Sequence, residues 1–170
     1  MIKAPLSVGF ALALLIAAGC GGGEADLVVN EIQPLSPEWL EIGNGGDSDV
    51  DVSGLGICDE DGSGDCDTAK AMFFPEGTVI PAHGHILVMT NDKAENNGVL
   101  SSDCVAGVPS CFHAIFKISA KDGEKIRLID KEGVEIDSLS YPADATSDPG
   151  QSWSRLPDIT GEASDRKSVV

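Results

Sequence analysis

The densest group of side chains that could bind a ligand or react is an acidic stretch between two cysteines. Within nine residues stand five carboxylates, at Asp59, Glu60, Asp61, Asp65 and Asp67. Ca²⁺ prefers carboxylate oxygens, so Asp59, Asp61, Asp65 and Asp67 are candidate calcium ligands. The spacing is not that of an EF-hand, because Lys70 stands at the twelfth place, where a bidentate Glu is needed. The alternative interpretation is a solvated acidic loop that keeps an exported protein soluble.

Two histidines form a second candidate metal site. His83 and His85 are separated by one residue, a spacing that places two imidazoles on one side of a strand and suits a transition metal. They follow Pro81 at a turn, so surface histidines are the alternative interpretation. The sequence has no Gly-x-Ser-x-Gly elbow and no glycine-rich phosphate loop before a helical pattern. We therefore predict no catalytic residues and no enzyme, and a small secreted hydrolase is only a third hypothesis.

Four cysteines outside the N-terminal region fall into two local pairs, Cys58 with Cys66 and Cys104 with Cys111. An even number of cysteines in an exported chain is typical of disulfides. Three connectivities are open, and pairing within each loop is the simplest. Zinc is the rival interpretation, but the spacing contains no C-x-x-C pair.

The N-terminal segment predicts export and lipid attachment. Lys3 precedes an uncharged apolar run from Leu6 to Ala18, which has the length of a signal-peptide core and is too short for a membrane span. The end of the run, Ala17-Ala18-Gly19-Cys20, resembles a bacterial lipobox. The resemblance implies cleavage before Cys20, a diacylglycerol on its thiol, and a further acyl chain such as palmitate on the new N-terminus. An ordinary secretory signal and an uncleaved anchor are the alternatives.

These residues predict the following organisation: a signal peptide at 1–19, an acylated cysteine with a flexible linker at 20–26, a folded domain at 27–160, and a polar tail at 161–170. Gly21-Gly22-Gly23 supplies the flexible tether. No Asp follows Cys20, which favours the outer membrane of a bacterial cell envelope over retention at the inner membrane.

The charge excludes one class of partner. The 28 acidic residues outnumber the 11 basic ones, for a net charge of −17. Proteins that bind nucleic acid neutralise phosphates with clustered Lys and Arg, so we predict no nucleic-acid partner. The predicted partners are the membrane, through the N-terminal lipid, and a protein or surface whose identity the sequence does not reveal. Apart from the calcium hypothesis, we predict no cofactor.

The elements between the motifs are short strands. Residues 38–42 alternate acidic and apolar side chains, residues 86–89 form an apolar run suited to a strand covered on both faces, and residues 126–129 and 134–139 flank a hairpin turn at Gly133. About nine such strands occur, with turn residues between them and no sustained helical period. The pattern predicts an all-β, two-sheet sandwich.

The order of these segments resembles the lamin tail domain family. The similar parts are Val29-Asn30-Glu31-Ile32, then Glu38-Trp39-Leu40-Glu41-Ile42, then Gly77 to Gly84, then Asp122 to Leu128, and lastly Gln151 to Asp158. The resemblance implies an immunoglobulin-like β-sandwich, a fold found in exported bacterial proteins. With the lipobox it predicts a non-catalytic lipoprotein whose domain acts as a binding or structural module. The alternative is a calcium-dependent binding or adhesion domain that uses the acidic stretch.

Three residues have expected structural roles. Trp39 and Trp153 are predicted to be aromatics of the core or its edge, and a sugar-stacking platform is the alternative. Arg155 is one of few cations in the folded region. We expect it to pair with a partly buried acid such as Glu31 or Glu41, because a buried charge needs a partner.

Overall fold

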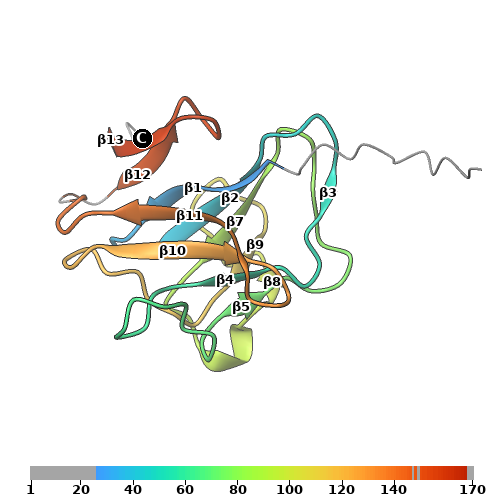
Figure 1. Cartoon of the computed structure of the whole chain (residues 1–170), viewed down its shortest axis with the longest axis horizontal. Coiled ribbons are helices and arrows are strands. Elements are labelled where there is room, and N and C mark those ends of the chain that lie inside the picture. The colour runs from blue at the N-terminus through green and yellow to red at the C-terminus, as the bar shows by residue number, and fades with distance from the viewer. Residues whose placement is uncertain (1–25, 147, 149, 168–170) are drawn as a thin grey trace, which may run out of the picture.

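A computed structural model describes residues 26–146, 148 and 150–167. The strands of the described chain form two sheets that pack face to face, with a small two-stranded sheet at one end (Figure 1). The larger sheet has seven strands, in the order β13 (Glu162–Lys167), β12 (Gln151–Leu156), β1 (Leu27–Gln33), β2 (Trp39–Asn44), β7 (His85–Met89), β9 (Cys111–His113) and β8 (Leu100–Ser101).

The second sheet has four strands, in the order β11 (Glu135–Tyr141), β10 (Glu124–Ile129), β4 (Gly56–Cys58) and β5 (Met72–Phe73). Strands β3 (Val50–Asp51) and β6 (Val79–Ile80) form the two-stranded sheet, and η1 (Ala94–Asn96) is a single 3-10 turn. Strand pairs in the described chain are antiparallel, with the exception of β7 and β9. The architecture confirms the predicted all-β, immunoglobulin-like sandwich.

Alternation of side chains along the strands produces the core. In β2, Leu40 and Ile42 point inward and are fully buried, while Trp39 and Glu41 lie on the outer face. Successive side chains of a strand point to opposite faces, so a strand with this pattern covers a core with one face only. The largest buried side chains come from both sheets, and include Ile32, Leu40, Ile57, Ile126 and Leu128.

Two disulfides close loops on the sandwich. Cys58 is bonded to Cys66, and Cys104 is bonded to Cys111, so each cysteine pairs with its neighbour in sequence. This confirms the local pairing expected from the spacing, and it excludes the zinc interpretation of the four thiols. Arg127 of β10 connects the sheet to the loop closed by Cys58 and Cys66. Its guanidinium donates hydrogen bonds to Glu60 Oε1 (3.3 Å) and to the carbonyl of Gly64 (2.7 Å).

The strands differ from the prediction in three places. The described residues contain thirteen strands, because two-residue ladders such as β3, β6 and β8 carry too short a pattern to be recognised. Residues 162–167 form β13, which pairs with β12 along its whole length, so the predicted polar tail is wrong there. Strand β7 is also not covered on both faces, since only Val88 of its five residues is buried.

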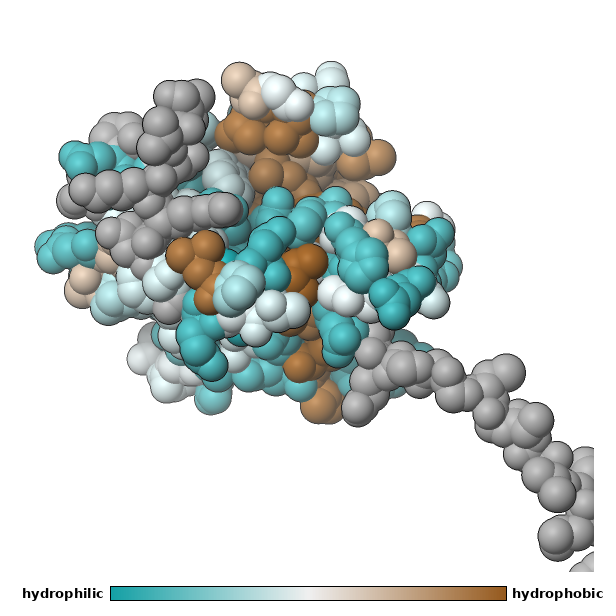
Figure 2. All heavy atoms as spheres, turned by 90° about the horizontal axis from the view of Figure 1, so that it is seen from above, coloured by the Kyte–Doolittle hydropathy of each residue, from teal (hydrophilic) through white to brown (hydrophobic). Residues whose placement is uncertain are grey.

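Much of the surface is hydrophilic, in agreement with the net charge of −17. Figure 2 shows one face of the molecule, on which polar side chains predominate and apolar ones gather in separate clusters. Within the described residues no helix is long and apolar enough to cross a membrane. The predicted signal peptide, Cys20 and the glycine tether lie outside the described residues.

Glu38, just before β2, is a buried carboxylate that should make stability depend on pH. Its Oε2 accepts from the backbone N–H of Ile118 (3.2 Å) and its Oε1 from Asn91 Nδ2 (3.3 Å). Burial raises the pKa of Glu38, against the opposing effects of these hydrogen bonds and of nearby Lys117. The folded protein therefore holds this proton more tightly than the unfolded chain does, and stability falls as pH rises through the folded pKa.

The variant Glu38→Gln should not show this decrease in stability with rising pH, because it has no carboxyl group to ionise at position 38. Relative to the parent protein, the free energy of unfolding of the variant is expected to increase from about pH 4 to about pH 7. Urea unfolding at several pH values measures the trend, and the exposed Glu132→Gln is the control for loss of a carboxylate. A difference between parent and variant that shrinks with rising pH would contradict the assignment.

Candidate functional site

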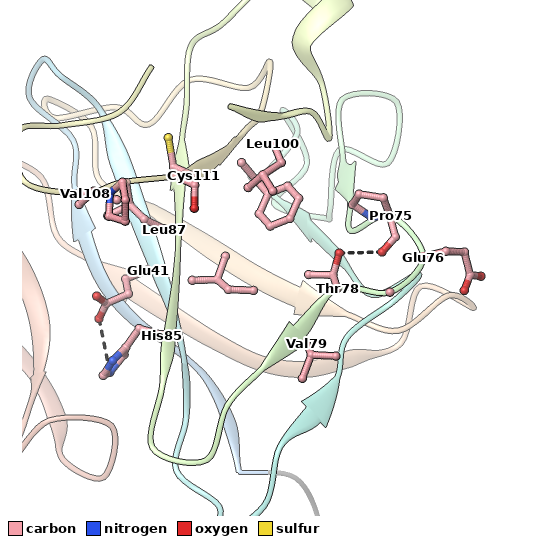
Figure 3. Close-up of a pocket in the computed structure, with 15 residues that line it drawn as sticks. Glu41, Pro75, Glu76, Thr78, Val79, His85, Leu87, Leu100, Val108 and Cys111 are labelled. Carbon is pink, nitrogen blue, oxygen red and sulfur yellow. Dashed lines mark hydrogen bonds and ion pairs between the residues drawn. The ribbon is translucent and has the colours of Figure 1, made fainter. Parts of the chain in front are cut away.

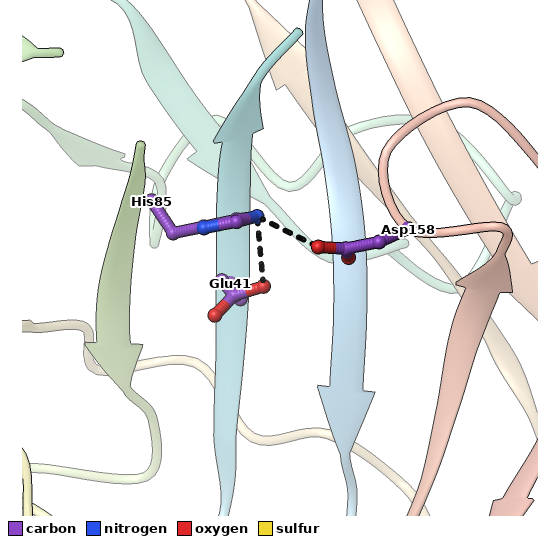
Figure 4. A group of neighbouring side chains, drawn as sticks. All are labelled: Glu41, His85 and Asp158. Carbon is purple, nitrogen blue, oxygen red and sulfur yellow. Dashed lines mark ion pairs between the residues drawn. The ribbon is translucent and has the colours of Figure 1, made fainter. Parts of the chain in front are cut away.

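Three side chains that are far apart in sequence converge on the outer face of the seven-stranded sheet. Glu41 comes from β2, His85 from the start of β7, and Asp158 from the turn between β12 and β13 (Figure 4). The His85 Nε2 atom lies 3.7 Å from Glu41 Oε1 and 3.6 Å from Asp158 Oδ2. One nitrogen and two carboxylates thus face a common centre, with ligand atoms that all lie within 4.8 Å of one another. We call these three residues the Glu41 cluster.

Strand register and a tightly packed turn bring the cluster together. His85 pairs with Gly43 across the β2–β7 ladder, which places its ring beside Glu41 on the same face. The turn that carries Asp158 lies against β2, where Ile159 covers two glycines. A Cβ at Gly43 would lie 3.0 Å from Ile159 Cγ1, and one at Gly45 would lie 2.7 Å from Ile159 Cγ2. The absence of side chains there lets the turn approach the sheet closely.

Asn30 of β1 donates hydrogen bonds to both carboxylates of the cluster. Its Nδ2 donates to Glu41 Oε1 (2.7 Å) and to Asp158 Oδ1 (2.8 Å), and its Oδ1 accepts from the backbone N–H of Ile159 (2.8 Å). The residue is only 1% exposed, so its amide is committed to these contacts. Asn30 is on this face because the β1–β2 register shifts between Val29 and Glu31.

The cluster carries an excess of negative charge. Burial raises the pKa of Glu41, and repulsion from Glu31 and Asp158 adds to the shift, whereas the hydrogen bond from Asn30 and the proximity of His85 act in the opposite direction. Glu31 stands opposite Glu41 on the neighbouring strand and accepts a hydrogen bond from Ser152 Oγ. The site thus concentrates acidic groups around one imidazole.

A groove runs from this cluster along the sheet. It has a volume of about 630 Å³, and Figure 3 shows Glu41 and His85 across it from Pro75, Glu76 and Thr78. Its apolar lining includes Leu87, Leu100 and Val79. Leu100 is 56% exposed and Val79 is 45% exposed, so both present apolar surface to solvent in the groove. The groove combines an apolar wall with an acidic end.

The four predicted calcium ligands do not meet. Asp61 accepts from the backbone N–H and hydroxyl of Ser63, and Asp67 pairs with Lys70 at 2.7 Å. Asp59 is nearly buried, and burial raises the pKa of its carboxyl. Of the described residues, Asp59, Asp61, Asp65 and Asp67 do not form a group whose ligand atoms converge on one centre. Asp61 and Asp65 share the hydroxyl of Ser63, and these local contacts support a solvated acidic loop.

The two histidines of the predicted transition-metal pair point to different partners. His83 lies in the turn with Nε2 3.1 Å from Asp47 Oδ1, while His85 joins the Glu41 cluster. Trp153 is partly buried and packs against the main core, as expected for an aromatic of the core edge. Trp39 is also partly buried, and lies on the outer face of β2.

Arg155 pairs with a partly buried acid, Asp137 of β11. Its Nη2 donates to both carboxylate oxygens of Asp137 (3.1 and 2.9 Å), and its Nε donates to the carbonyl of Val29 (3.0 Å). This confirms the predicted pairing with a partly buried acid, and strand alternation explains why the acid is Asp137 and not Glu31 or Glu41. Ser154 is the residue opposite Glu31, so the next side chain along β12, Arg155, points to the other face, where β11 supplies Asp137.

A second polar cluster has the order of contacts found in serine hydrolases. Ser101 Oγ lies 2.7 Å from His113 Nε2, and His113 Nδ1 lies 2.6 Å from Asp92 Oδ2. Ser101 Oγ also accepts from the backbone N–H of Asp103, and the contact of Nδ1 with Asp92 is not aligned as a hydrogen bond. His113 and Asp92 share a hollow that Ser101 does not line. We interpret the cluster as the polar partners of a buried histidine.

Sequence reasoning missed the Glu41 cluster. The alternating pattern of residues 38–42 places Glu41 on the face opposite Leu40, which was a usable signal for an outward carboxylate. The pattern contains no information about which strand lies beside the one that carries Glu41. The pairing with β7 and the fold of the β12–β13 turn join residues 44 and 73 positions apart.

Comparison with known protein families matches the lamin tail domain over residues 22–143. The chain belongs to the lamin tail domain family. The match includes Glu41 and His85 but ends before β12, so Asp158 and the β12–β13 hairpin of this lamin tail domain lie beyond it. A search of curated proteins found no match.

Proposed function

We propose that this lamin tail domain is the exposed part of a lipid-anchored bacterial envelope protein, and that it acts by binding and not by catalysis. One observation carries the proposal: a leader that ends in a lipobox-like Cys20 is joined by the short segment 21–26 to the first strand of the domain, β1, which begins at Leu27. Two or three acyl chains make anchoring stable where a single chain does not.

The chemistry of the folded part supports export. Two disulfides within one small domain are typical of oxidising compartments outside the cytoplasm. The acidic surface is suited to a protein that must stay soluble while tethered at a membrane. The binding role is supported by the groove beside β7, because exposed apolar side chains gathered in a hollow are typical of interaction sites.

The anchoring is tested with Cys20→Ala. Metabolic labelling with a radioactive fatty acid should mark the parent protein and not the variant, and the variant should leave the membrane fraction. Gly22→Ala, which changes the tether without touching the cysteine, is the matched control and should stay labelled. A Cys20→Ala protein that remains labelled would end the lipoprotein assignment.

The same cells test the binding role. A photo-crosslinking amino acid at Leu100, in the groove, should yield discrete crosslinked products in intact cells. The control position is Val134, which is 61% exposed and lies in the β10–β11 turn away from the groove. Equal products from both positions, or none from Leu100, would count against the groove as the contact surface.

A further inference from the structure

We propose that Glu41, His85 and Asp158 bind one divalent transition-metal ion of the zinc type, with a fourth coordination position open toward the groove. This goes beyond the proposed envelope function and does not depend on it. The site takes one residue from each of three separate segments, so it exists only in the folded domain.

Two of the three ligand–ligand distances lie close to those of a zinc site. Ligand atoms bound to one tetrahedral zinc at about 2.0–2.2 Å lie about 3.3–3.6 Å from one another. The His85 Nε2 atom lies 3.7 Å from Glu41 Oε1 and 3.6 Å from Asp158 Oδ2. The two contacts of the ring thus need shifts of at most a few tenths of an ångström, and the two carboxylate oxygens, which lie within 4.8 Å of each other, would move closer as the ion binds.

The type and number of ligands select among metals. Imidazole nitrogen with carboxylate oxygen suits zinc and related transition metals, whereas Ca²⁺ needs six to eight oxygens. Three protein ligands leave a position for water or for a group from a bound partner. Because Glu41 and His85 also line the groove, that position opens onto it.

Asn30 supplies the support that metal ligands need. Hydrogen bonds from residues behind the ligands fix their orientation, and loss of such a partner typically weakens metal binding. Asn30 Nδ2 donates to one oxygen of Glu41 and one of Asp158, and leaves Asp158 Oδ2 free to face His85. The buried amide thus holds two ligands from opposite sides of the site in place.

Charge and access also favour a cation. Glu31 adds a third acidic group next to the two carboxylates, so a dication would neutralise a region that holds only one imidazole against them. The side chains of His85, Glu41 and Asp158 are 27%, 22% and 57% exposed, which leaves a path for the ion from solvent.

The test is calorimetric titration of the full chain, first stripped with a chelator, with zinc chloride. We expect one ion per chain, and weaker binding by at least about tenfold in His85→Ala, Glu41→Gln and Asp158→Asn. Glu41→Gln retains an oxygen that can accept from Asn30. Weaker zinc binding by this variant therefore reports on the missing charge and not on misfolding. His83→Ala is the matched control, because that histidine lies two residues away and pairs with exposed Asp47 outside the cluster.

Two further readings separate this site from adventitious binding. Cobalt should give visible absorption bands of a four-coordinate ion in the parent and in His83→Ala, and not in His85→Ala. Excess calcium should not displace the zinc. The proposal is overturned if the parent binds no zinc, if His85→Ala binds zinc as tightly as His83→Ala does, or if calcium competes at equal concentration.

Discussion

The Gly123→Ala variant is expected to lose about 3–5 kcal/mol of unfolding free energy, the largest effect of any single methyl group proposed for this domain. Gly123 precedes β10 and has a φ of 70°, which strains any residue with a Cβ. A Cβ there would also lie 2.5 Å from the carbonyl carbon of Pro142 and 2.6 Å from the backbone nitrogen of Ala143. Both are backbone atoms, so they cannot swing aside as a side chain can.

The strain would spread because the contact lies at the open end of a hairpin. Glu124 pairs with Tyr141 next to it, and Tyr141 is a buried residue whose hydroxyl donates to the carbonyl of Ser119 (2.9 Å). Making room for the methyl group would separate β10 from β11 at this end. The hydroxyl of Tyr141 would then lose the environment in which burial raises its pKa.

Urea unfolding followed by tryptophan fluorescence measures the loss. Gly133→Ala is the matched control: its φ of 84° is also left-handed, but nothing lies within 4 Å of the added Cβ. We expect the control to cost only about 1 kcal/mol, the conformational part alone. If both variants lose the same amount, the close approach of residues 141–143 to Gly123 is not present in solution.

Arg155→Met is the second change with a large expected effect, about 2–4 kcal/mol. Its guanidinium contacts both oxygens of Asp137 and the carbonyls of Val29 and Ser138, and so joins β12 to β1 and β11. The side chains of Arg155 and Asp137 are 18% and 23% exposed. Removing the cation would leave the partly buried carboxylate of Asp137 with the backbone N–H of Val29 but without a positively charged partner.

The control is an ion pair of the same kind at the surface. Lys125 contacts Glu135 at 3.2 Å, and both side chains are about a third exposed, so Lys125→Met is expected to change stability by less than about 1 kcal/mol. Arg155→Lys should lose most of the energy as well, because an ammonium cannot reproduce the forked contacts. A loss in Arg155→Met no greater than in Lys125→Met would show that the pair is energetically unimportant.

The sequence was most informative where a pattern is local. The alternation of residues 38–42, the hairpin turn at Gly133 and the cysteine spacing each depend on neighbours along the chain, and all three are confirmed. The strand Glu162–Lys167 was missed because its residues are mostly polar, and its place in the sheet comes from pairing with β12.

The candidate site was the least predictable part, for the same physical reason. The sequence predicts metal ligands in the acidic run at Asp59–Asp67, where carboxylates are dense but turn toward local partners such as Ser63 and Lys70. The cluster that the fold assembles contains one member each from three segments. Only the β2–β7 register and the docking of Ile159 on Gly45 decide that His85 and Asp158 meet Glu41.

The position of β1 has a consequence for how the chain reaches its native state. One edge of β1 pairs with β2, a few residues later, and the other pairs with β12, where Glu31 stands opposite Ser154. The pairing of β1 with β12 is distant in sequence, and such a pairing slows folding because a long loop must close before the contact is made. While the chain is synthesised from its N-terminus, one edge of β1 therefore stays exposed to other strands until β12 has been made. Protection by a chaperone during that interval would matter most for this segment.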